Sequence, residues 1–340
     1  MRVSILPAKD ITPGLVDLWV EGQQANPALR SPFFRPEFTQ AVAATGVPTS
    51  VGVIDDGAAF FPFHREMLGI GRPVGARLSD YHGVIAQPEF EFDAAQLVRA
   101  AGLRLWDFDH VPAAQTAFLP AAKGHADSPQ IDLDLPDAGG SAKLREQASN
   151  RRRKLAREVG PVELEFHCTD AQMLQQCWNW KGAQYERSGF ENIFSVPWMC
   201  AALSTIAASA TPNFSGSLSV LRAGGRPVAM HFGMRSGNLL HYWLPSYDPE
   251  LAVYSPGTLL LLAIMDAAPQ NGVSVIDLGK GDAFYKSRLC NASTPLIEGT
   301  VTSGPLSPLL KQSRDTVRRW VRASPLRRPA EILIRRLRGR

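Results

Sequence analysis

Alternating apolar and polar positions mark a group of strands in the second half of the chain. The alternation is clearest over residues 218–222, 228–234 and 239–244, and the short segments between these runs contain a Gly-Gly pair and a Ser-Gly pair. Glycine and small polar residues are typical of tight hairpin turns. The pattern therefore predicts a three-stranded antiparallel meander.

The stretch 273–289, VSVIDLGKGDAFYKSRL, has a different pattern, because both faces of its first six residues are largely apolar. Such a strand is expected between two covering layers. Gly279 and Gly281 then allow a sharp turn, and α/β sheets bind ligands at the carboxyl ends of their strands. The stretch predicts a buried strand over 273–278 that ends in a functional loop; a solvated loop in which Asp282 caps the next helix is the alternative. The polar side chains here are Asp277, Lys280, Asp282, Tyr285 and Lys286.

Periodicity and cap residues predict the remaining elements. In the first half, strands are expected over 3–6, 49–54, 59–66, 76–81, 103–111 and 131–135, with helices from about residue 10, over 36–45 and over 94–101. In the second half, a further strand is expected over 162–167, with helices over 141–158, 170–187, 197–209 and 256–268.

Both halves show nearly the same order of elements, and DYHGVIAQPEF with GLRLWDFDHV echoes SYDPELAVYSPG with GVSVIDLGKG. The echo predicts an internal duplication of the α/β (α+β) class, in which two tandem domains each contain a mixed, mostly antiparallel sheet flanked by helices. A chance match between two ordinary α/β units is the alternative. The predicted division is a first domain over 1–138, a basic helical connector over 139–160, a second domain over 161–305 and a basic amphipathic tail over 306–340.

The composition is that of an ordinary globular protein, with 45% hydrophobic and 20% charged residues in 340. The longest apolar run, 259–265, is far shorter than the roughly 20 residues of a membrane span. The first residues have only a short apolar run before Pro7, which is too little for a secretory signal. We therefore expect the protein in the cytoplasm.

Several classes of site are disfavoured by missing patterns. The four cysteines show no CxxC spacing and no grouping with histidine, so neither a disulfide framework nor a metal site is predicted. The sequence also lacks GxGxxG, GxxxxGK[ST], GxSxG and HExxH. Rossmann and P-loop nucleotide sites, serine hydrolases and zinc peptidases are therefore disfavoured.

The net charge of +4 is unevenly distributed, because residues 311–340 hold 11 Lys and Arg against 2 acids, a local balance of 11 − 2 = +9. The rest of the chain therefore carries 4 − 9 = −5. Apolar residues interleave with the basic ones in this tail, which suits an anionic surface such as the inner membrane, or RNA. No DNA contact is expected. A solvated tail without a partner is the alternative.

One candidate for chemistry is a histidine on the middle meander strand. His231 lies between Ala229 and Gly233 on one face of that strand, which leaves room for a ligand beside an imidazole able to act as a base. A structural histidine is the alternative. His241 and Trp243 on the next strand share a face, and we expect them to extend the same surface as substrate contacts.

Two other segments contain candidate substrate contacts. The segment SDYHG at 79–83 is dense in polar groups for a strand end, with a capping turn as the alternative. Its candidate residues are Asp80, Tyr81 and His82. Lys181 and Tyr185 lie one helical turn apart and can border an acceptor pocket.

The segment YSPGT at 254–258 opens a predicted helix. Ser255 can cap this helix, Pro256 suits its first position, and Gly257 lets another molecule approach the backbone. The N–H groups and the positive dipole end of a helix start favour a pyrophosphate. An ordinary capped helix is the alternative.

The order of the second-half elements, with a capped helix after the third meander strand, resembles the GNAT acyltransferase superfamily. SPFFRPEF, LSDYHG, RRRKLAREVG and DLGKGDAFYKSRL resemble more specifically the CelD-like branch, bacterial proteins linked to cellulose and exopolysaccharide biosynthesis. The tandem layout also resembles the FemABX peptidoglycan transferases, in which a related double fold uses aminoacyl-tRNA.

The GNAT resemblance implies transfer of an acyl group from acetyl-CoA or a longer acyl-CoA to an amine, such as an amino sugar of a cell-surface polysaccharide. The pantetheine arm would lie between strands 239–244 and 273–278, beside Leu244. The pyrophosphate would contact the helix start at Tyr254, Ser255, Gly257 and Thr258. This chain departs from the usual pyrophosphate pattern, since Ser255 replaces its middle glycine.

Acyl transfer to an amine needs a base for the amine and an acid for the thiolate. Tyr285 is the expected acid, His231 or Asp282 the expected base, and Lys286 the group that neutralises negative charge. No metal is expected. Two other interpretations remain: an aminoacyl-tRNA-dependent transferase, whose donor would suit the basic connector, and a non-catalytic tandem module that binds sugars or partner proteins.

Overall fold

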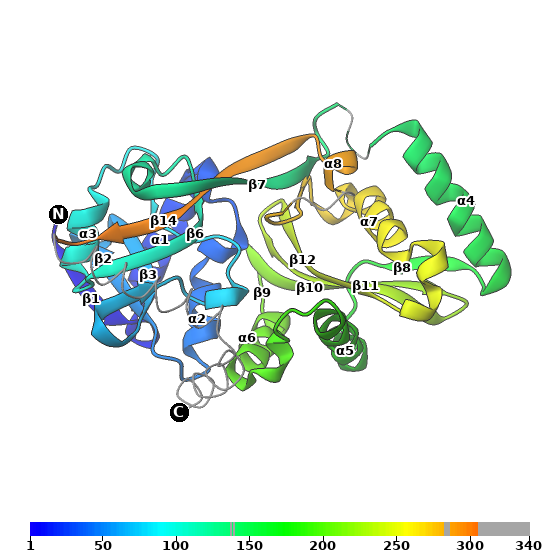
Figure 1. Cartoon of the computed structure of the whole chain (residues 1–340), viewed down its shortest axis with the longest axis horizontal. Coiled ribbons are helices and arrows are strands. Elements are labelled where there is room, and N and C mark those ends of the chain that lie inside the picture. The colour runs from blue at the N-terminus through cyan, green and yellow to red at the C-terminus, as the bar shows by residue number, and fades with distance from the viewer. Residues whose placement is uncertain (137, 139, 282–285, 305–340) are drawn as a thin grey trace, which may run out of the picture.

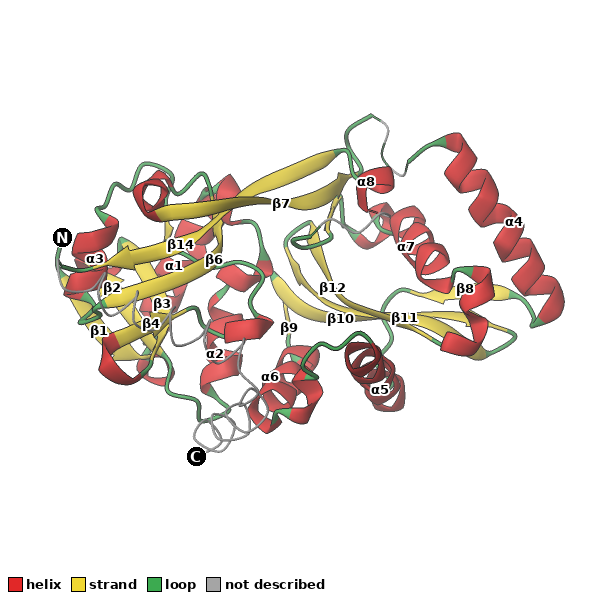
Figure 2. Cartoon of the chain, viewed as in Figure 1, coloured by secondary structure: helices red, strands yellow, loops and turns green. Residues whose placement is uncertain are grey.

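The computed structural model describes residues 1–136, 138, 140–281 and 286–304. Within these residues a continuous mixed sheet runs through the molecule, in the order β1-β2-β3-β4-β6-β14-β7-β13-β12-β11-β10-β8. Figures 1 and 2 show its two halves side by side, bridged at the top of the view by the long strands β7 and β14. The site described below lies close to this bridge.

The first half contains most of the expected elements. Its strands are β1 (Val3–Pro7), β2 (Ser50–Ile54), β3 (Ala59–Arg65), β4 (Ile70–Arg72), β5 (Ile85–Ala86), β6 (Leu105–Pro112) and β7 (Ala122–Asp132), and its helices are α1 (Pro13–Ala25), α2 (Pro36–Ala43) and α3 (Ala94–Ala100). The strands predicted over 49–54 and 59–66 are confirmed, and they form the antiparallel hairpin of β2 with β3. The strand predicted over 76–81 is wrong, because Gly75 turns the chain at φ +80° and Ala76–Leu78 then form a 3-10 helix.

The second half follows the predicted order closely. Its helices are α4 (Ala142–Glu158), α5 (Ala171–Arg187), α6 (Pro197–Ala208), α7 (Pro256–Ala267) and α8 (Lys286–Leu289). Its strands are β8 (Val162–Glu165), β9 (Ala210–Thr211), β10 (Phe214–Ala223), β11 (Arg226–Ser236), β12 (Leu239–Tyr247), β13 (Val275–Asp277) and β14 (Ala292–Thr302). The antiparallel meander is confirmed, since β11 pairs with both β10 and β12. The helix predicted over 170–187 has Asp170 as its N-cap, so the cap predicted at Thr169 is wrong.

The last strand joins the two halves. β14 lies within the range predicted as the second domain, yet it pairs antiparallel with β6 along one edge and with β7 along the other. β7 in turn pairs with β13 of the second half. The first half therefore depends on residues near the end of the described chain for two of its strand pairings.

Helices cover both faces of the second-half sheet. Helices α5 and α6 lie on one face and α7 with α4 on the other (Figure 2). The core beneath α5 and α6 is continuous with the first half, since one buried cluster includes Trp178 and Met230 together with Trp19 and Phe33. The opposite core contains Leu260 and other α7 side chains. No described helix has the length and apolar character needed to cross a bilayer.

Candidate functional site

The site is organised by a parallel strand pair that ends abruptly. β12 and β13 pair at Leu239 with Val275, Leu240 with Ile276 and His241 with Asp277, and β13 then stops. The N–H of Leu278 donates to the Pro129 carbonyl of β7, and Gly279 turns the chain at φ +72°. Since β12 continues to Tyr247, the two strands part directly after the His241–Asp277 pair.

A bulge in β12 lies at the same point. Phe232 of β11 faces Leu244 and Met234 faces His241, so β12 has one extra residue between these pairs. Gly233 sits opposite the bulge, and a Cβ atom there would lie 2.1 Å from the His241 carbonyl oxygen. Only glycine permits this close approach, which therefore explains the residue type.

Asp277 is the centre of a buried hydrogen-bond network. Its carboxylate is fully buried and accepts hydrogen bonds from donors of three segments. The donors are Tyr81 Oη at 2.5 Å, Ser128 Oγ at 2.6 Å, Gln130 Nε2 at 2.8 Å and the Gly279 N–H at 2.8 Å. A buried carboxylate is stable only when its oxygens are satisfied in this way. We call Asp80, Tyr81, Ser128, Gln130, His241 and Asp277 the junction network.

His241 lies between two carboxylates. Its Nε2 is 2.9 Å from Asp80 Oδ2, and its Nδ1 is 3.6 Å from Asp277 Oδ1. The imidazole is fully buried, with the Phe33 ring packed edge-on at 5.0 Å between centroids. The Asp80 side chain, in contrast, is 28% exposed. Asp80 is therefore the acidic member of the network that solvent and a substrate can reach.

The pKa shifts of the network keep its groups in defined states. Burial alone would raise the pKa of Asp80, but the hydrogen bond and charge of His241 outweigh it, so the pKa is lowered and Asp80 is ionised. Burial and the charge of Asp277 raise the pKa of Tyr81 well above its usual value. Tyr81 thus remains a hydrogen-bond donor over the whole physiological range.

The predicted catalytic residues after β13 are only partly covered. Asp282 and Tyr285 lie outside the described residues. Lys286 is buried, and its Nζ donates to the carbonyl oxygens of Gly279 at 2.7 Å and Lys280 at 3.1 Å. Lys286 thus holds the turn that follows β13, a contact that the sequence did not suggest.

The α5 side chains Lys181 and Tyr185 lie against β12. Lys181 Nζ donates to the Pro245 carbonyl at 3.0 Å and lies 5.1 Å from the centroid of the Tyr185 ring. Burial lowers the pKa of Lys181 to about 8. Burial and the nearby charge of Asp80 raise the pKa of Tyr185 to about 12. Lys181 and Tyr185 therefore lie together on α5, against the strand β12 that also carries His241.

His231 is separate from the junction network. Its ring is fully buried and stacks on Tyr242 at 4.2 Å between centroids, whereas His241 and Trp243 both pack against Phe33 on the other face of the sheet. The expected shared surface of His231, His241 and Trp243 is therefore wrong. Burial lowers the pKa of His231 to about 3, so the ring is neutral.

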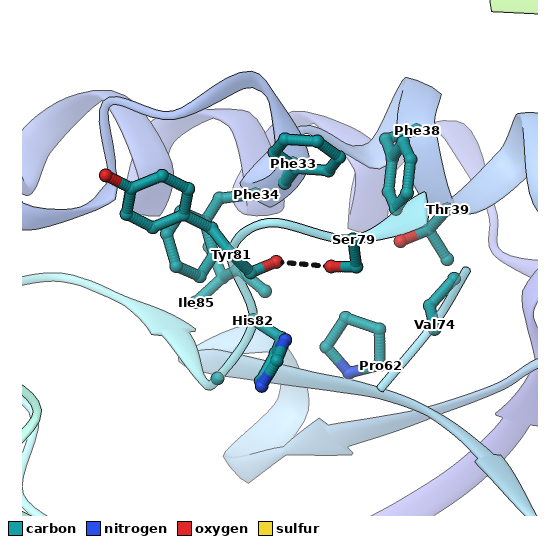
Figure 3. Close-up of a pocket in the computed structure, with 11 residues that line it drawn as sticks. Phe33, Phe34, Phe38, Thr39, Pro62, Val74, Ser79, Tyr81, His82 and Ile85 are labelled. Carbon is teal, nitrogen blue, oxygen red and sulfur yellow. Dashed lines mark hydrogen bonds between the residues drawn. The ribbon is translucent and has the colours of Figure 1, made fainter. Parts of the chain in front are cut away.

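His82 points away from Tyr81 into a small cavity, shown in Figure 3. Its Nε2 accepts the backbone N–H groups of Asp109 at 3.0 Å and His110 at 3.1 Å. Burial lowers the pKa of His82 to about 3. Ligand-type atoms of His82, Asp109 and His110 lie close enough together for a cation. However, the Nε2 lone pair already serves two N–H donors, so the arrangement suits a structural role.

The predicted pyrophosphate seat differs from the expected capped helix. Ser255 has φ +54° and its side chain makes no cap hydrogen bond, so the predicted cap is wrong. The chain before it forms a 3-10 helix, Pro249–Tyr254, and the Ser255 N–H donates to the Ala252 carbonyl at its end. Gly257 is open, since a Cβ there would meet only Tyr247 Cδ1 at 3.8 Å. Thr258 N–H bonds back to the Ser255 carbonyl.

Contacts around this helix start involve the basic helix α4. Tyr254 Oη donates to Glu158 Oε2 at 2.6 Å, and Lys154 Nζ lies 5.6 Å from the centroid of the Tyr254 ring. Leu244 is buried in the core on the α5 side, where its carbonyl lies 3.8 Å from Cys177 Sγ. Tyr254 and Leu244 thus both make contacts with other parts of the protein.

Comparison with known proteins agrees with this architecture. Residues 142–287 match the model of the Acetyltransferase (GNAT) domain. The second half of the chain contains a GNAT acyltransferase domain. No curated protein matches the chain.

Three solved structures share the fold of this chain over most of its length. FemX is 11% identical with a TM-score of 0.59, covering 91% of this chain and 99% of FemX. The C-terminal domain of a putative lysylphosphatidylglycerol synthetase from Agrobacterium fabrum is 13% identical with a TM-score of 0.55, covering 89% and 96%. L-PGS from Bacillus licheniformis is 11% identical with a TM-score of 0.54, covering 88% and 94%. The expected fold of two tandem GNAT-like domains is confirmed, and the protein is an acyltransferase.

Two members of the junction network were missed from sequence. Ser128 and Gln130 lie on β7, in a stretch that also holds Gly124 and Pro129 and so looks like a loop. Pro129 nevertheless lies within β7, opposite Ser293 of β14, and its carbonyl accepts from the Leu278 N–H. The alternation of apolar and polar residues in IDLDL, residues 131–135, predicted a strand here, but it covers only the end of β7.

Proposed function

We propose that the protein transfers an acyl group from acyl-CoA to a primary amine, with a small molecule or glycan such as an amino sugar as acceptor. The observation behind this proposal is the end of β13 at Asp277. The donor would enter where β12 and β13 part, so that its thioester lies beside the junction network. The CelD-like resemblance of the sequence motifs favours an amino sugar of a cell-surface polysaccharide.

The amine arrives as an ammonium group and must lose a proton before it attacks. Asp80 is ionised, partly exposed and hydrogen-bonded to His241, so we assign ammonium binding to Asp80 and proton uptake to the neutral form of the His241 imidazole behind it. The amine nitrogen then bonds to the thioester carbon and the carbon–sulfur bond breaks. Tyr285 stays the proposed donor of a proton to the thiolate, and Asp282 an alternative base.

The test is direct acyl transfer by the purified protein. We expect acetyl-CoA or a longer acyl-CoA to raise the melting temperature and to release CoA when an amino sugar is added. His241→Gln should abolish release while the thermal shift by acyl-CoA persists. Saturable donor binding without transfer to any amine would instead indicate a non-catalytic binding module.

An aminoacyl-tRNA donor is the second candidate, and a specific observation favours it. At the start of α7 the Ser255 N–H donates to the Ala252 carbonyl and the Thr258 N–H to the Ser255 carbonyl, so neither is free for a pyrophosphate. Helix α4 exposes Arg151, Arg153 and Lys154, and Lys154 lies over the Tyr254 ring at this helix start. FemX and L-PGS share the fold. Replacement of these three side chains by Gln should then reduce tRNA binding and leave acyl-CoA binding unchanged.

A further inference from the structure

The turn between β3 and β4 exposes two large apolar side chains. Met67 is 86% exposed and Leu68 is 63% exposed, at the tip formed by Glu66–Gly69. Leu68 has φ +61°, a left-handed conformation that glycine adopts far more readily. The tip thus presents a leucine where a turn alone would favour glycine, and neither side chain contributes to the core.

Arginines frame this tip. The Arg104 N–H donates to the Gly69 carbonyl at 2.8 Å, and Arg65 reaches across to Gly102, where a Cβ would lie 3.4 Å from its Nη1. Arg99 Nε donates to the Ser303 carbonyl at 2.9 Å. All three arginines are exposed, and none forms an ion pair with a carboxylate of the described chain. The nearest acid of the tip, Glu66, is paired with Arg72 at 3.4 Å.

The last residues of the described chain lie on the same surface. Ser303, near the end of the described chain, donates through its N–H and its Oγ to the Arg104 carbonyl at 3.0 and 3.1 Å. The sequence then continues to residue 340, and 311–340 holds the local charge of 11 − 2 = +9. Ser303 is therefore joined through Arg104 to the Met67–Leu68 tip.

We propose that the Met67–Leu68 tip, with Arg65, Arg99 and Arg104, docks this protein on an anionic phospholipid surface. The two apolar side chains would enter the boundary between headgroups and acyl chains, while the arginines face lipid phosphates. Aliphatic side chains favour a bilayer over RNA, because single-stranded RNA is bound by aromatic stacking.

The docking surface leaves the junction network open. β14 runs from α8, near the network, to the end of the first half, where α3 lies (Figure 1). The tip is held against residues at this far end of β14 and the start of β6. A membrane-docked protein can therefore still receive its substrates at the parting of β12 and β13.

The test is flotation of the full chain with vesicles of phosphatidylcholine, with or without added phosphatidylglycerol. We expect binding only to the anionic vesicles, and weaker binding as salt rises. M67S/L68S should weaken binding about tenfold. Each change of Arg65, Arg99 or Arg104 to Gln should weaken it about fivefold.

Leu68→Gly is the most informative variant, because glycine suits φ +61°. It should maintain or raise the melting temperature while weakening vesicle binding, which separates docking from folding. Phe190→Ser, at a side chain 68% exposed elsewhere, is the matched control and should bind like the parent protein. Unchanged binding of M67S/L68S and Leu68→Gly would overturn the proposal and assign any binding to the tail. Binding to RNA but not to anionic vesicles would overturn it as well.

Discussion

At the scale of single residues, the junction network separates a group that substrate can reach from groups that hold it in place. Asp277 and His241 are fully buried, while Asp80 is partly exposed. Tyr81 and Gly279 hold Asp277 from opposite halves of the chain. A substrate amine would therefore meet Asp80 first, with His241 behind it.

Asp80→Asn tests this order. Asparagine has the same shape and can still accept from His241, so the melting temperature should change little. It lacks the negative charge that binds an ammonium ion, so the kcat/KM for the amine should fall about 100-fold. The measurement is steady-state CoA release with the amine varied. An unchanged kcat/KM would exclude Asp80 from the reaction.

His231 gives a pH prediction at the same scale. Its folded-state pKa is lowered to about 3, so between the ordinary value near 6.5 and pH 3 only the unfolded chain takes up this proton. Stability from a neutral His231 is thus lost as pH falls below about 6.5, by up to ~1.4 kcal/mol per pH unit.

His231→Phe keeps an aromatic ring against Tyr242 and removes this titration. The free energy of unfolding of the variant, minus that of the parent, should therefore increase as pH falls from 6.5 to 4. Urea unfolding at several pH values measures it. A constant offset from imperfect packing is allowed, but a difference independent of pH would contradict the prediction.

At the scale of elements, α5 packs against β12 to form one wall of the second-half core. Lys181 on α5 donates to the Pro245 carbonyl of β12, and its ammonium group is buried there, which lowers its pKa. Cys177 and Ser246 pack nearby at 3.4 Å. This wall is fixed by contacts between one helix and one strand, and its polarity changes with the protonation of Lys181.

Lys181→Met tests the buried charge. Because the folded pKa is about 8 and the ordinary value is 10.5, the unfolded chain binds this proton more strongly between these pH values. The parent should therefore gain stability relative to Lys181→Met as pH rises from 8 to 10.5, by up to ~1.4 kcal/mol per pH unit. Chemical unfolding of both proteins across this range is the measurement; parallel curves would refute the shift.

At the scale of the whole molecule, β14 makes the two halves interdependent. The strand follows α8 of the second half and lies between β6 and β7 of the first. Gly299 lies at its bulge, where a Cβ would be 2.1 Å from the Ala121 carbonyl oxygen and 2.8 Å from Phe108 Cζ. A substitution that disrupts β14 should therefore lower the stability of both halves together.

Gly299→Ala should lower the free energy of unfolding by about 2–3 kcal/mol, because the new methyl group forces the backbone apart. Calorimetry should show one transition, shifted as a whole. Gly304→Ala, where a Cβ meets nothing within 4 Å, is the matched control and should leave the transition unchanged. Two separated transitions in the Gly299 variant would show that the halves unfold independently.

Much of this protein could be predicted from local pattern. Period-two alternation located β10, β11 and β12, and the abrupt change after Asp277 located the turn that borders the site. The two-residue turn at Gly237 and Asn238 also fixes the register of β11 with β12. In this register His241 lies opposite Met234. The same register places His231 and His241 on opposite faces of the sheet.

The sequence by itself determined the order of elements, their tandem repetition and the polar residues at strand ends, because these follow from neighbours along the chain. Only the tertiary structure decided that β14 crosses into the first half and that Ser128 and Gln130 join Tyr81 on Asp277. Such contacts join residues more than 100 positions apart, so no local pattern along the chain records them. The contacts to Asp277 form because a buried carboxylate needs hydrogen-bond donors.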